Sequence, residues 1–373
     1  MAVEVKEVVT RRDLKKYVKF PFQLYRNNKY WAPPFIRDEL KNLDPKVNPA
    51  FEYCRAKNWL AYKDGKIAGR ITAIINDKVI EKWKVKKARF DWVDFIDDHE
   101  VSRALFRVGE DWARENGMEF IEGPMGFTDL DDEGMLIEGF EEQGTYPMIY
   151  NYPYYPEHLE KLGYVKEVDW LEFEVKVPDS IPDKVSRIND LIMKRSGFRL
   201  LDAKKPKDFK PYIPAFWDII EEAYDDIFGS IPLTERQKNY YTKQYFDFIV
   251  PEYSKFILNE KDEVVAAGIA LPNLTEALRK SNGHLFPFGV FYMLYALKHP
   301  KKLDFYLIGV RKKYQGSGVI SIMMNEINKN AIKAGIESCE TAGELEDNKA
   351  VQDMWKHYEY RQHKRRRCFI KTL

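Results

Sequence analysis

Cysteine is scarce in this sequence, with three cysteines among 373 residues. Cys54, Cys339 and Cys368 lie far apart and form no CxxC pair. The sequence therefore excludes a disulfide framework and favours a reducing compartment. The six histidines show no metal-ligand spacing, and we expect no bound metal.

Long hydrophobic runs are also absent. The longest one covers residues 286–297, which is shorter than the ~20 residues that a membrane-spanning helix needs. We expect it to form a buried helix, with the lining of a pocket for an acyl chain or an apolar acceptor as the alternative. The first residues are charged and do not resemble a signal peptide. These features favour a soluble, cytoplasmic protein without a membrane span.

Net charge is nearly absent too, because 60 Lys and Arg residues stand against 59 Asp and Glu residues. This balance argues against a broad nucleic-acid-binding surface, and we expect no nucleic-acid partner. The basic run at residues 361–367 is expected to be the solvated face of a strand, with contact to a cofactor phosphate or to a nucleic acid as the alternatives. Apolar residues make up 45% of the chain, enough for a full hydrophobic core.

The order of predicted elements repeats once along the chain. Residues 1–178 contain strands with a helix over 101–115 between two of them. Pro178 and Pro182 mark a linker, and residues 179–373 then show the same order. We predict an α/β protein of two tandem domains, each with a mixed central sheet flanked by helices.

The second half contains a segment typical of phosphate binding. An apolar strand leads into the basic residues 311–313, then Gln315-Gly316-Ser317-Gly318, then a helix that begins at Val319. Glycines let backbone N–H groups turn toward one point, and a helix start favours an anion. The segment has neither the Gly-Lys-Ser/Thr of a Walker loop nor the GxGxxG of a dinucleotide fingerprint. It therefore predicts a pyrophosphate site of another kind.

This segment resembles the acetyl-CoA loop of the GNAT acyltransferase superfamily, whose pattern is Q/R-x-x-G-x-G/A. Gln315 and Gly318 match its first two fixed positions, and Ile320 departs from the third. The resemblance implies tandem GNAT-like domains, with acetyl-CoA or another acyl-CoA as co-substrate in the second. It implies that the cofactor-binding residues are Ile308, Val310, Gln315, Gly316, Ser317, Gly318, Val319 and Asn348.

A second stretch extends the resemblance. The segment from Asn348 to Tyr358 resembles the N-x-x-A-x-x-hydrophobic-Tyr helix of the same superfamily, with Trp355 at the position of the general-acid tyrosine. Tyr358 is our candidate for the acid, and Glu340, on the preceding strand, is our candidate for the base. In the first half, residues 151–164 are similar to the N…EKLGF segment of GNAT domains.

The first half lacks a comparable phosphate loop. At the matching turn it has Asp97, Asp98 and Glu100 and no glycine, and carboxylates there would repel an anion. We predict a degenerate copy that supplies scaffold and part of the acceptor cleft. Its long acidic loop over residues 123–147 lacks the spacing of a calcium-binding EF-hand and is expected to be solvated, with acceptor binding as the alternative.

The predicted activity is N-acyl transfer from acyl-CoA to an unidentified amine of a small molecule or peptide. Two other functions stay open. Trp355 at the acid position favours a non-catalytic CoA-binding or interaction protein. Tandem GNAT-like domains also occur in peptidoglycan-bridge enzymes that use charged tRNA, although the near-zero net charge disfavours tRNA binding.

Overall fold

Local signals determine where several helices begin and end in the structure, a computed structural model that describes residues 2–145 and 148–373. Thr10 caps helix α1 (Arg11–Leu24), because its side chain accepts a hydrogen bond from the amide of Asp13. Asp98 caps α4 (His99–Glu115) in the same way. Helix α11 (Val319–Ala334) starts after Gly318 and stops at Gly335, both with positive φ.

The first half of the chain contains two kinds of elements. Its strands are β1 (Glu4–Glu7), β2 (Cys54–Lys63), β3 (Lys66–Asn76), β4 (Lys87–Phe95), β5 (Phe120–Gly123), β6 (Met135–Glu138) and β7 (Val165–Lys176). Its helices, besides α1 and α4, are α2 (Ile36–Asn42), α3 (Asp77–Trp83), α5 (Tyr154–Lys161) and the 3-10 turn η1 (Pro49–Glu52).

The second half repeats the pattern with additions. Its strands are β8 (Arg199–Leu200), β9 (Lys255–Leu258), β10 (Val264–Pro272), β11 (Lys302–Val310), β12 (Ser338–Thr341), β13 (Glu344–Leu345) and β14 (Tyr360–Thr372). Its other helices are α6 (Asp183–Ser196), α7 (Ile213–Tyr224), α8 (Glu235–Tyr245), α9 (Thr275–Ser281), α10 (Gly289–Lys298) and α12 (Lys349–Trp355), with 3-10 turns η2 (Pro206–Tyr212), η3 (Phe246–Phe248) and η4 (Lys312–Tyr314).

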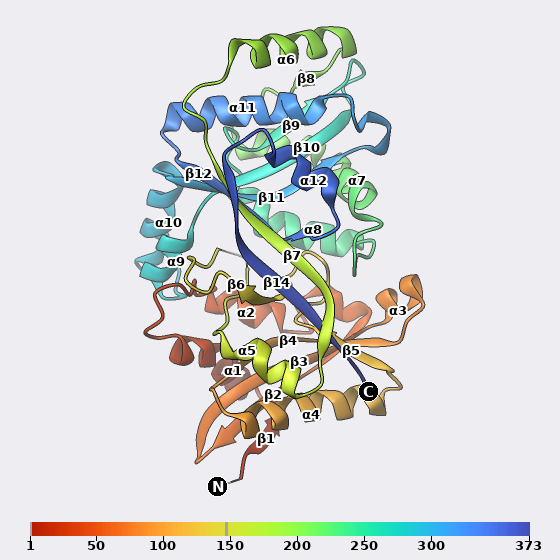
Figure 1. Ribbon diagram of the computed structural model, residues 1–373, viewed down its shortest axis with the longest axis vertical. Coiled ribbons are helices and arrows are strands. Elements are labelled where there is room, and N and C mark those ends of the chain that lie inside the picture. Colours follow the sequence, from red (N-terminus) through yellow and green to blue (C-terminus); the bar gives the residue numbers. More distant parts are fainter. Residues whose placement is uncertain (1, 146–147) are drawn as a thin grey trace.

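The two halves share one unit and complete one continuous sheet. In each half two parallel strands, β4 and β5 or β11 and β12, are joined by a crossover helix, α4 or α11. The strand order is β1-β2-β3-β4-β5-β14-β7-β12-β11-β10-β9-β8. The long strands β7 and β14 thus run side by side through the middle of the molecule (Figure 1). Because β14 pairs with β5 and β7 pairs with β12, each half receives a strand from the other.

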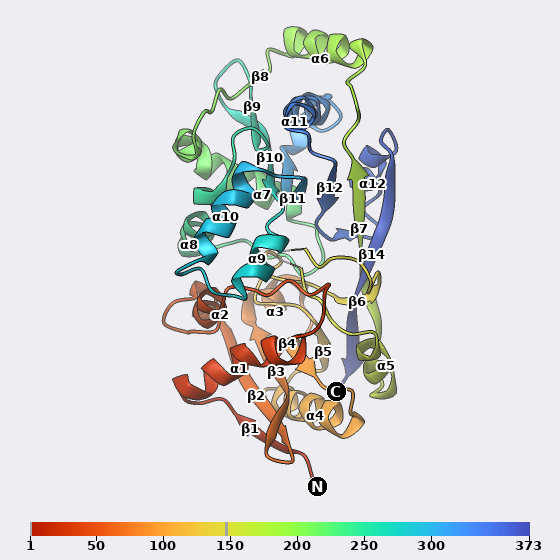
Figure 2. The ribbon, with the colours of Figure 1, turned by 90° about the vertical axis from the view of Figure 1, so that its left-hand side faces the viewer.

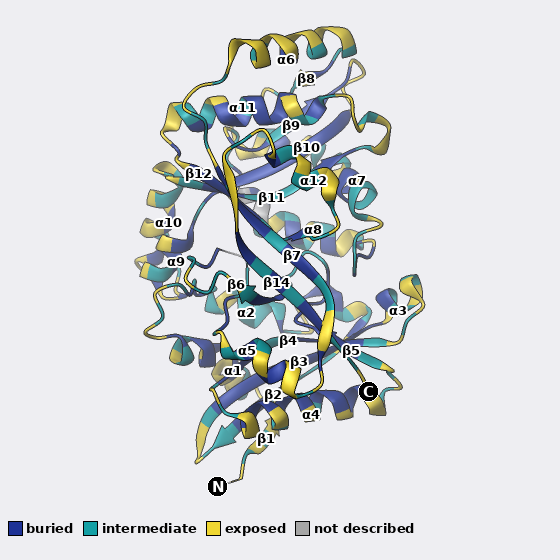
Figure 3. Ribbon diagram, viewed as in Figure 1, coloured by how far each residue is buried: buried dark blue, intermediate teal, exposed yellow. Residues whose placement is uncertain are grey.

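Helices cover both faces of the sheet, and the hydrophobic core lies between them (Figure 2). In the second half, Ala266 belongs to the cluster under α11, whereas its neighbour Ala267 belongs to the cluster under α7. This alternation follows from the period of two in a strand. The central strands are buried, and the outer faces of the helices are exposed (Figure 3).

The α/β fold predicted from the sequence is confirmed, and the predicted linker at residues 178–182 lies between β7 and α6. Three local expectations were wrong. The acidic loop contains a strand, β6, which pairs with β14; residues 146–147 of that loop lie outside the described residues. The apolar run at 286–297 is largely exposed. The basic run is not a solvated face, because Lys364 and Arg366 are buried.

Candidate active site

A cavity opens where strands β11 and β12 separate. The two strands are paired from Lys302 opposite Ser338 to Phe305 opposite Thr341. Beyond that point β11 continues to Val310, paired only with β10 on its other side. One backbone edge of β11 therefore faces a cavity of about 760 Å³.

Most of the cavity wall is apolar. Its polar lining comes from the loop that follows β11, from the acidic loop of the first half and from residues around the end of β12. A cavity of this volume lies in the range of small-molecule sites. Its apolar lining includes Phe216, Trp217, Ile269, Leu271, Leu307, Met324, Met354 and Trp355.

The loop after β11 has the backbone of an anion site. Gly316 and Gly318 have φ of 73° and 83°, in the left-handed region. The amide of Ser317 donates to the Tyr314 carbonyl at 3.2 Å, whereas those of Gly316 and Gly318 donate to no backbone carbonyl in the described chain. The first amides of α11, beginning at Val319, have no partner within the helix. Free N–H groups at a helix start favour a negatively charged ligand.

The structure brings together most of the predicted cofactor-binding residues. Those that line the cavity are Ile308, Val310, Gln315, Gly316, Gly318, Val319 and Asn348. Ser317 is absent from the lining, and its hydroxyl donates to the Tyr314 carbonyl at 2.6 Å. Asn348 also caps α12, because its side chain accepts from the amide of Val351. Ile320 faces the same cavity, so an apolar side chain stands beside the loop.

The free edge of β11 is contacted by Tyr224, at the end of α7. The Tyr224 hydroxyl donates to the Ile308 carbonyl at 3.3 Å and lies 3.5 Å from the Ile308 amide nitrogen. Burial raises the pKa of Tyr224 to about 12. The phenol therefore keeps its proton at neutral pH and can donate it. No sequence motif marked this residue.

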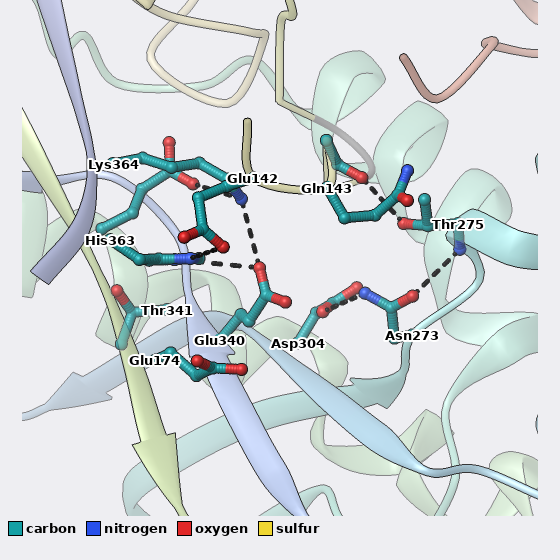
Figure 4. A network of polar contacts seen from close by, with 12 residues as sticks. Glu142, Gln143, Glu174, Asn273, Thr275, Asp304, Glu340, Thr341, His363 and Lys364 are labelled. Atoms are coloured by element: carbon teal, nitrogen blue, oxygen red, sulfur yellow. Dashed lines mark hydrogen bonds and ion pairs between the residues drawn. The ribbon is translucent and has the colours of Figure 1, made fainter. Parts of the chain in front are cut away.

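Glu340 lines the cavity, but its charge is compensated by neighbouring cations (Figure 4). One of its oxygens lies 3.2 Å from the Lys364 ammonium and 3.8 Å from the His363 ring, and the other lies 3.5 Å from the Lys302 ammonium. The two ammonium groups balance the charge of Glu340 within the sheet. Glu340 thus has the contacts of a structural ion pair.

Asp304, on the adjacent strand β11, is a buried carboxyl group whose hydrogen-bond partner is uncharged. Its Oδ1 accepts a hydrogen bond from Asn273 at 2.8 Å, and its Oδ2 has no partner in the described chain. Burial, reinforced by the negative charge of Glu340, raises the pKa of Asp304 to about 8. Asp304 therefore carries a proton at neutral pH.

Glu344 is the carboxyl group best suited to act as a base. It lines the cavity just past the end of β12 and is 9% exposed. Burial raises the pKa of Glu344 to about 7, although the Trp355 indole N–H donates to its Oε1 at 2.8 Å and so favours the charged form. A base with a pKa near the working pH is most effective. Its Oε2 has no hydrogen-bond partner among the described residues.

Glu344 was not singled out from the sequence. Trp355 was singled out; it is the last residue of α12, and its indole N–H donates to Glu344. Tyr358, the predicted acid, lies outside the cavity lining, and its hydroxyl accepts a hydrogen bond from the Asn328 side chain at 3.0 Å. Trp355, at the position of the superfamily's tyrosine, is buried and supplies the hydrogen bond to Glu344.

The acidic loop of the first half is not solvated as expected, because it forms one wall of the cavity. Asp129, Asp131 and Glu133 line the cavity. Burial raises the pKa of Asp131 to about 6 and that of Glu133 well above its usual value. In the parts of the chain that the structure describes, no group of His, Cys, Asp and Glu residues is arranged to hold a metal ion. With a pKa of about 6, Asp131 carries a negative charge at neutral pH and lines the same cavity as the glycine-rich loop.

The basic C-terminal strand forms ion pairs inside the sheet. Arg365 and Arg367 both contact the buried Asp169, at 2.7 and 2.8 Å. Arg366 pairs with the buried Glu172. These charges hold β14 against β7 and leave little of the run available for a polyanion.

Comparison with known proteins supports the fold. No family model matches the chain. "Protein YghO" of Escherichia coli K12 is 29% identical over 376 residues, which cover 99% of this chain and 95% of that protein. The "Bacterial ceramide synthase" of Caulobacter vibrioides is 27% identical over 377 residues, covering 98% and 96%.

Solved structures agree with the repeated strand and helix order described above. A tandem GNAT protein from the clavulanic acid biosynthesis pathway matches 99% of this chain and 98% of its own, with a TM-score of 0.56 and 11% identity. This chain has a tandem GNAT fold. Within this fold, the cavity lies at the separating strands of the second half, and the first half contributes the acidic loop to its wall.

Proposed function

We propose that this tandem GNAT protein transfers an acyl group from acyl-CoA to the primary amine of a long-chain amino alcohol. A ceramide is an amide of that kind, and the relative named a bacterial ceramide synthase aligns with nearly the whole chain. The observation that carries the proposal is the cavity itself. Its lining joins a large apolar wall to a loop suited to a pyrophosphate and to Asp131, a carboxylate suited to a cationic amine.

The two polar parts of the lining would select the two substrates by charge. The amides around Gly316 and Gly318 would hold the CoA diphosphate, and Asp131 would attract the ammonium form of the acceptor. The apolar wall accepts the hydrocarbon parts of both substrates. The sequence predicted an unidentified amine and acetyl-CoA as the simplest donor; the apolar wall favours longer chains on both.

The reaction needs one proton acceptor and one proton donor. The amine nitrogen attacks the thioester carbonyl carbon, a C–N bond forms, and the C–S bond breaks. The ammonium of the bound acceptor first releases one proton to water. Glu344 takes the second proton, which the nitrogen loses as it attacks, and the Tyr224 phenol supplies a proton to the departing thiolate, so that CoA leaves as the thiol. The proton on Glu344 then returns to the Tyr224 phenolate through water. The backbone edge of β11 that β12 leaves free, between Ile308 and Val310, offers a hydrogen bond to the carbonyl oxygen.

The test combines binding and turnover. Purified protein is incubated with acetyl-, octanoyl- or palmitoyl-CoA together with sphinganine or a short amine, and free CoA and amide are both quantified. We expect amide formation with sphinganine and a preference for the longer donors. Melting temperatures measured with free CoA identify binding without turnover. A thermal shift without amide from any pair would favour the non-catalytic alternative, and no shift with any CoA species would exclude the site at residues 315–319.

A further inference from the structure

Helix α10 and the turn before it present large apolar side chains to solvent. Phe286 and Phe288 are each 69% exposed, and Phe291 and Tyr295 are 65% and 68% exposed. Figure 3 shows the outer side of α10 in the colour of exposed residues. The α10 patch consists of Phe286, Phe288, Phe291, Tyr292, Leu294 and Tyr295.

The helix that bears the patch is firmly packed. Met293, on the opposite side of α10, is buried in a cluster with Leu274 and Leu278 around α9. Phe35 of the first half packs against the same cluster. The patch is therefore a second apolar face on a docked helix. In a helix on a water-facing surface that outer face is ordinarily polar.

The segment that carries the patch has charge of one sign. From Ser281 to Leu303 the sequence contains no Asp or Glu, and it contains Lys298 and Lys301, besides Lys302, which is paired with Glu174 and Glu340. Helix α6 offers a useful contrast, because its exposed apolar residues alternate with both acidic and basic ones. The α10 patch thus combines exposed aromatic rings with the lysines Lys298 and Lys301 of its own segment.

We propose that the α10 patch binds the surface of a bilayer that contains anionic phospholipids, with α10 lying parallel to the membrane plane. Aromatic side chains favour the interface between water and hydrocarbon, and lysines favour anionic headgroups. No helix in the described residues is long and apolar enough to cross a membrane, which fits a helix that lies in the interface. A two-fold dimer built on this patch would instead bring the same lysines together.

The patch is connected to the cavity through α9. Asn273, just before α9, donates its side-chain amide to Asp304 in the cavity wall, and Thr275 donates its hydroxyl to the Gly144 carbonyl (Figure 4). Figure 2 shows α9 and α10 together on one side of the second half. If the acceptor is a lipid amine, which rests on the proposed function, docking at α10 would hold the cavity close to its source. Membrane binding itself does not depend on that activity.

Vesicle co-sedimentation tests the proposal without any substrate. Full-length protein is mixed with phosphatidylcholine vesicles prepared with or without phosphatidylglycerol. We expect binding to the phosphatidylglycerol vesicles that weakens as salt is raised. Phe291→Ser/Leu294→Ser should lower the partition coefficient at least about tenfold, because two side chains that would enter the interface are lost. Lys298→Ala/Lys301→Ala should reduce the preference for phosphatidylglycerol.

The matched control removes exposed apolar side chains elsewhere. Val9 and Val165 are 80% and 62% exposed, and Val9→Ser/Val165→Ser should bind vesicles as the unchanged protein does. Thermal melts and size-exclusion chromatography with light scattering accompany each variant. The proposal is overturned if the unchanged protein ignores both kinds of vesicle, or if the folded α10 variant binds them equally well. A dimer that dissociates in Phe291→Ser/Leu294→Ser would also overturn it. Failure here leaves the acyl-transfer assay, run in detergent, unaffected.

Discussion

Trp355 should set the pH at which this protein becomes active. Its indole N–H donates to the buried Glu344 at 2.8 Å, and a hydrogen bond to a charged group is worth about 1.5–3 kcal/mol. Burial raises the pKa of Glu344 to about 7, and this hydrogen bond opposes the increase. Trp355→Phe removes this hydrogen bond. Because 1.36 kcal/mol corresponds to one pKa unit, the pKa of Glu344 should rise by about one to two further units.

The sign of the effect follows from the role of the base. In the proposed mechanism only ionised Glu344 accepts the proton of the amine, so kcat/KM should rise with pH through the pKa of Glu344. In Trp355→Phe that acidic limb should move from near pH 7 toward pH 8–9, so that activity lost at neutral pH returns in alkaline buffer. In Glu344→Gln, kcat/KM should be about 10²- to 10⁴-fold lower at every pH.

The assay is the pH profile of kcat/KM for CoA release. Tyr358→Phe is the matched control, because Tyr358 contacts Trp355 but lies outside the cavity lining; its acidic limb should stay in place. If Trp355→Phe lowers the rate without moving the limb, Trp355 only fills space and Glu344 is not the base. A large loss in Tyr358→Phe would restore that tyrosine as the acid.

Three further predictions test other parts of the molecule. A Cβ added at Gly316 would meet no atom within 4 Å, so the variants Gly316→Asp and Gly316→Asn differ from each other mainly in charge. In calorimetric titration Gly316→Asp should weaken CoA binding at least about fivefold more than Gly316→Asn does. Equal CoA affinities of the two variants would exclude a diphosphate near this residue. Asp131→Asn should raise KM for the amine at least about fivefold with little change in kcat, and an unchanged KM would remove Asp131 from acceptor binding. Arg366→Met leaves Glu172 buried without its main partner and should cost about 3–5 kcal/mol in urea unfolding. Arg366 and Lys364 overcome the effect of burial and lower the pKa of Glu172 to about 2. The unchanged protein should therefore lose the stability contributed by this ion pair as pH falls from about 4.5 to 2. In Glu172→Gln the free energy of unfolding should decrease less over the same pH range.

The sequence by itself determined the features that depend on neighbouring residues. Caps at Thr10 and Asp98, and the glycines at 318 and 335, define helix ends through local hydrogen bonds and backbone freedom. The glycine-rich loop was recognisable for the same reason, since its geometry needs only a short stretch of chain. The repeated order of strands and helices was also predictable, because each pair of parallel strands and its crossover helix are consecutive in the chain.

Tertiary structure alone decided what depends on distant partners. The base candidate moved from Glu340 to Glu344 because lysines of other strands neutralise the first and leave the second buried beside Trp355. The acidic loop became a cavity wall only when the second half packed against it. The prediction of a buried helix at residues 286–297 was wrong because the side chains that pack against α10 cover only one of its faces. A residue's type and spacing predict its local conformation, but its pKa and exposure depend on what the fold places beside it.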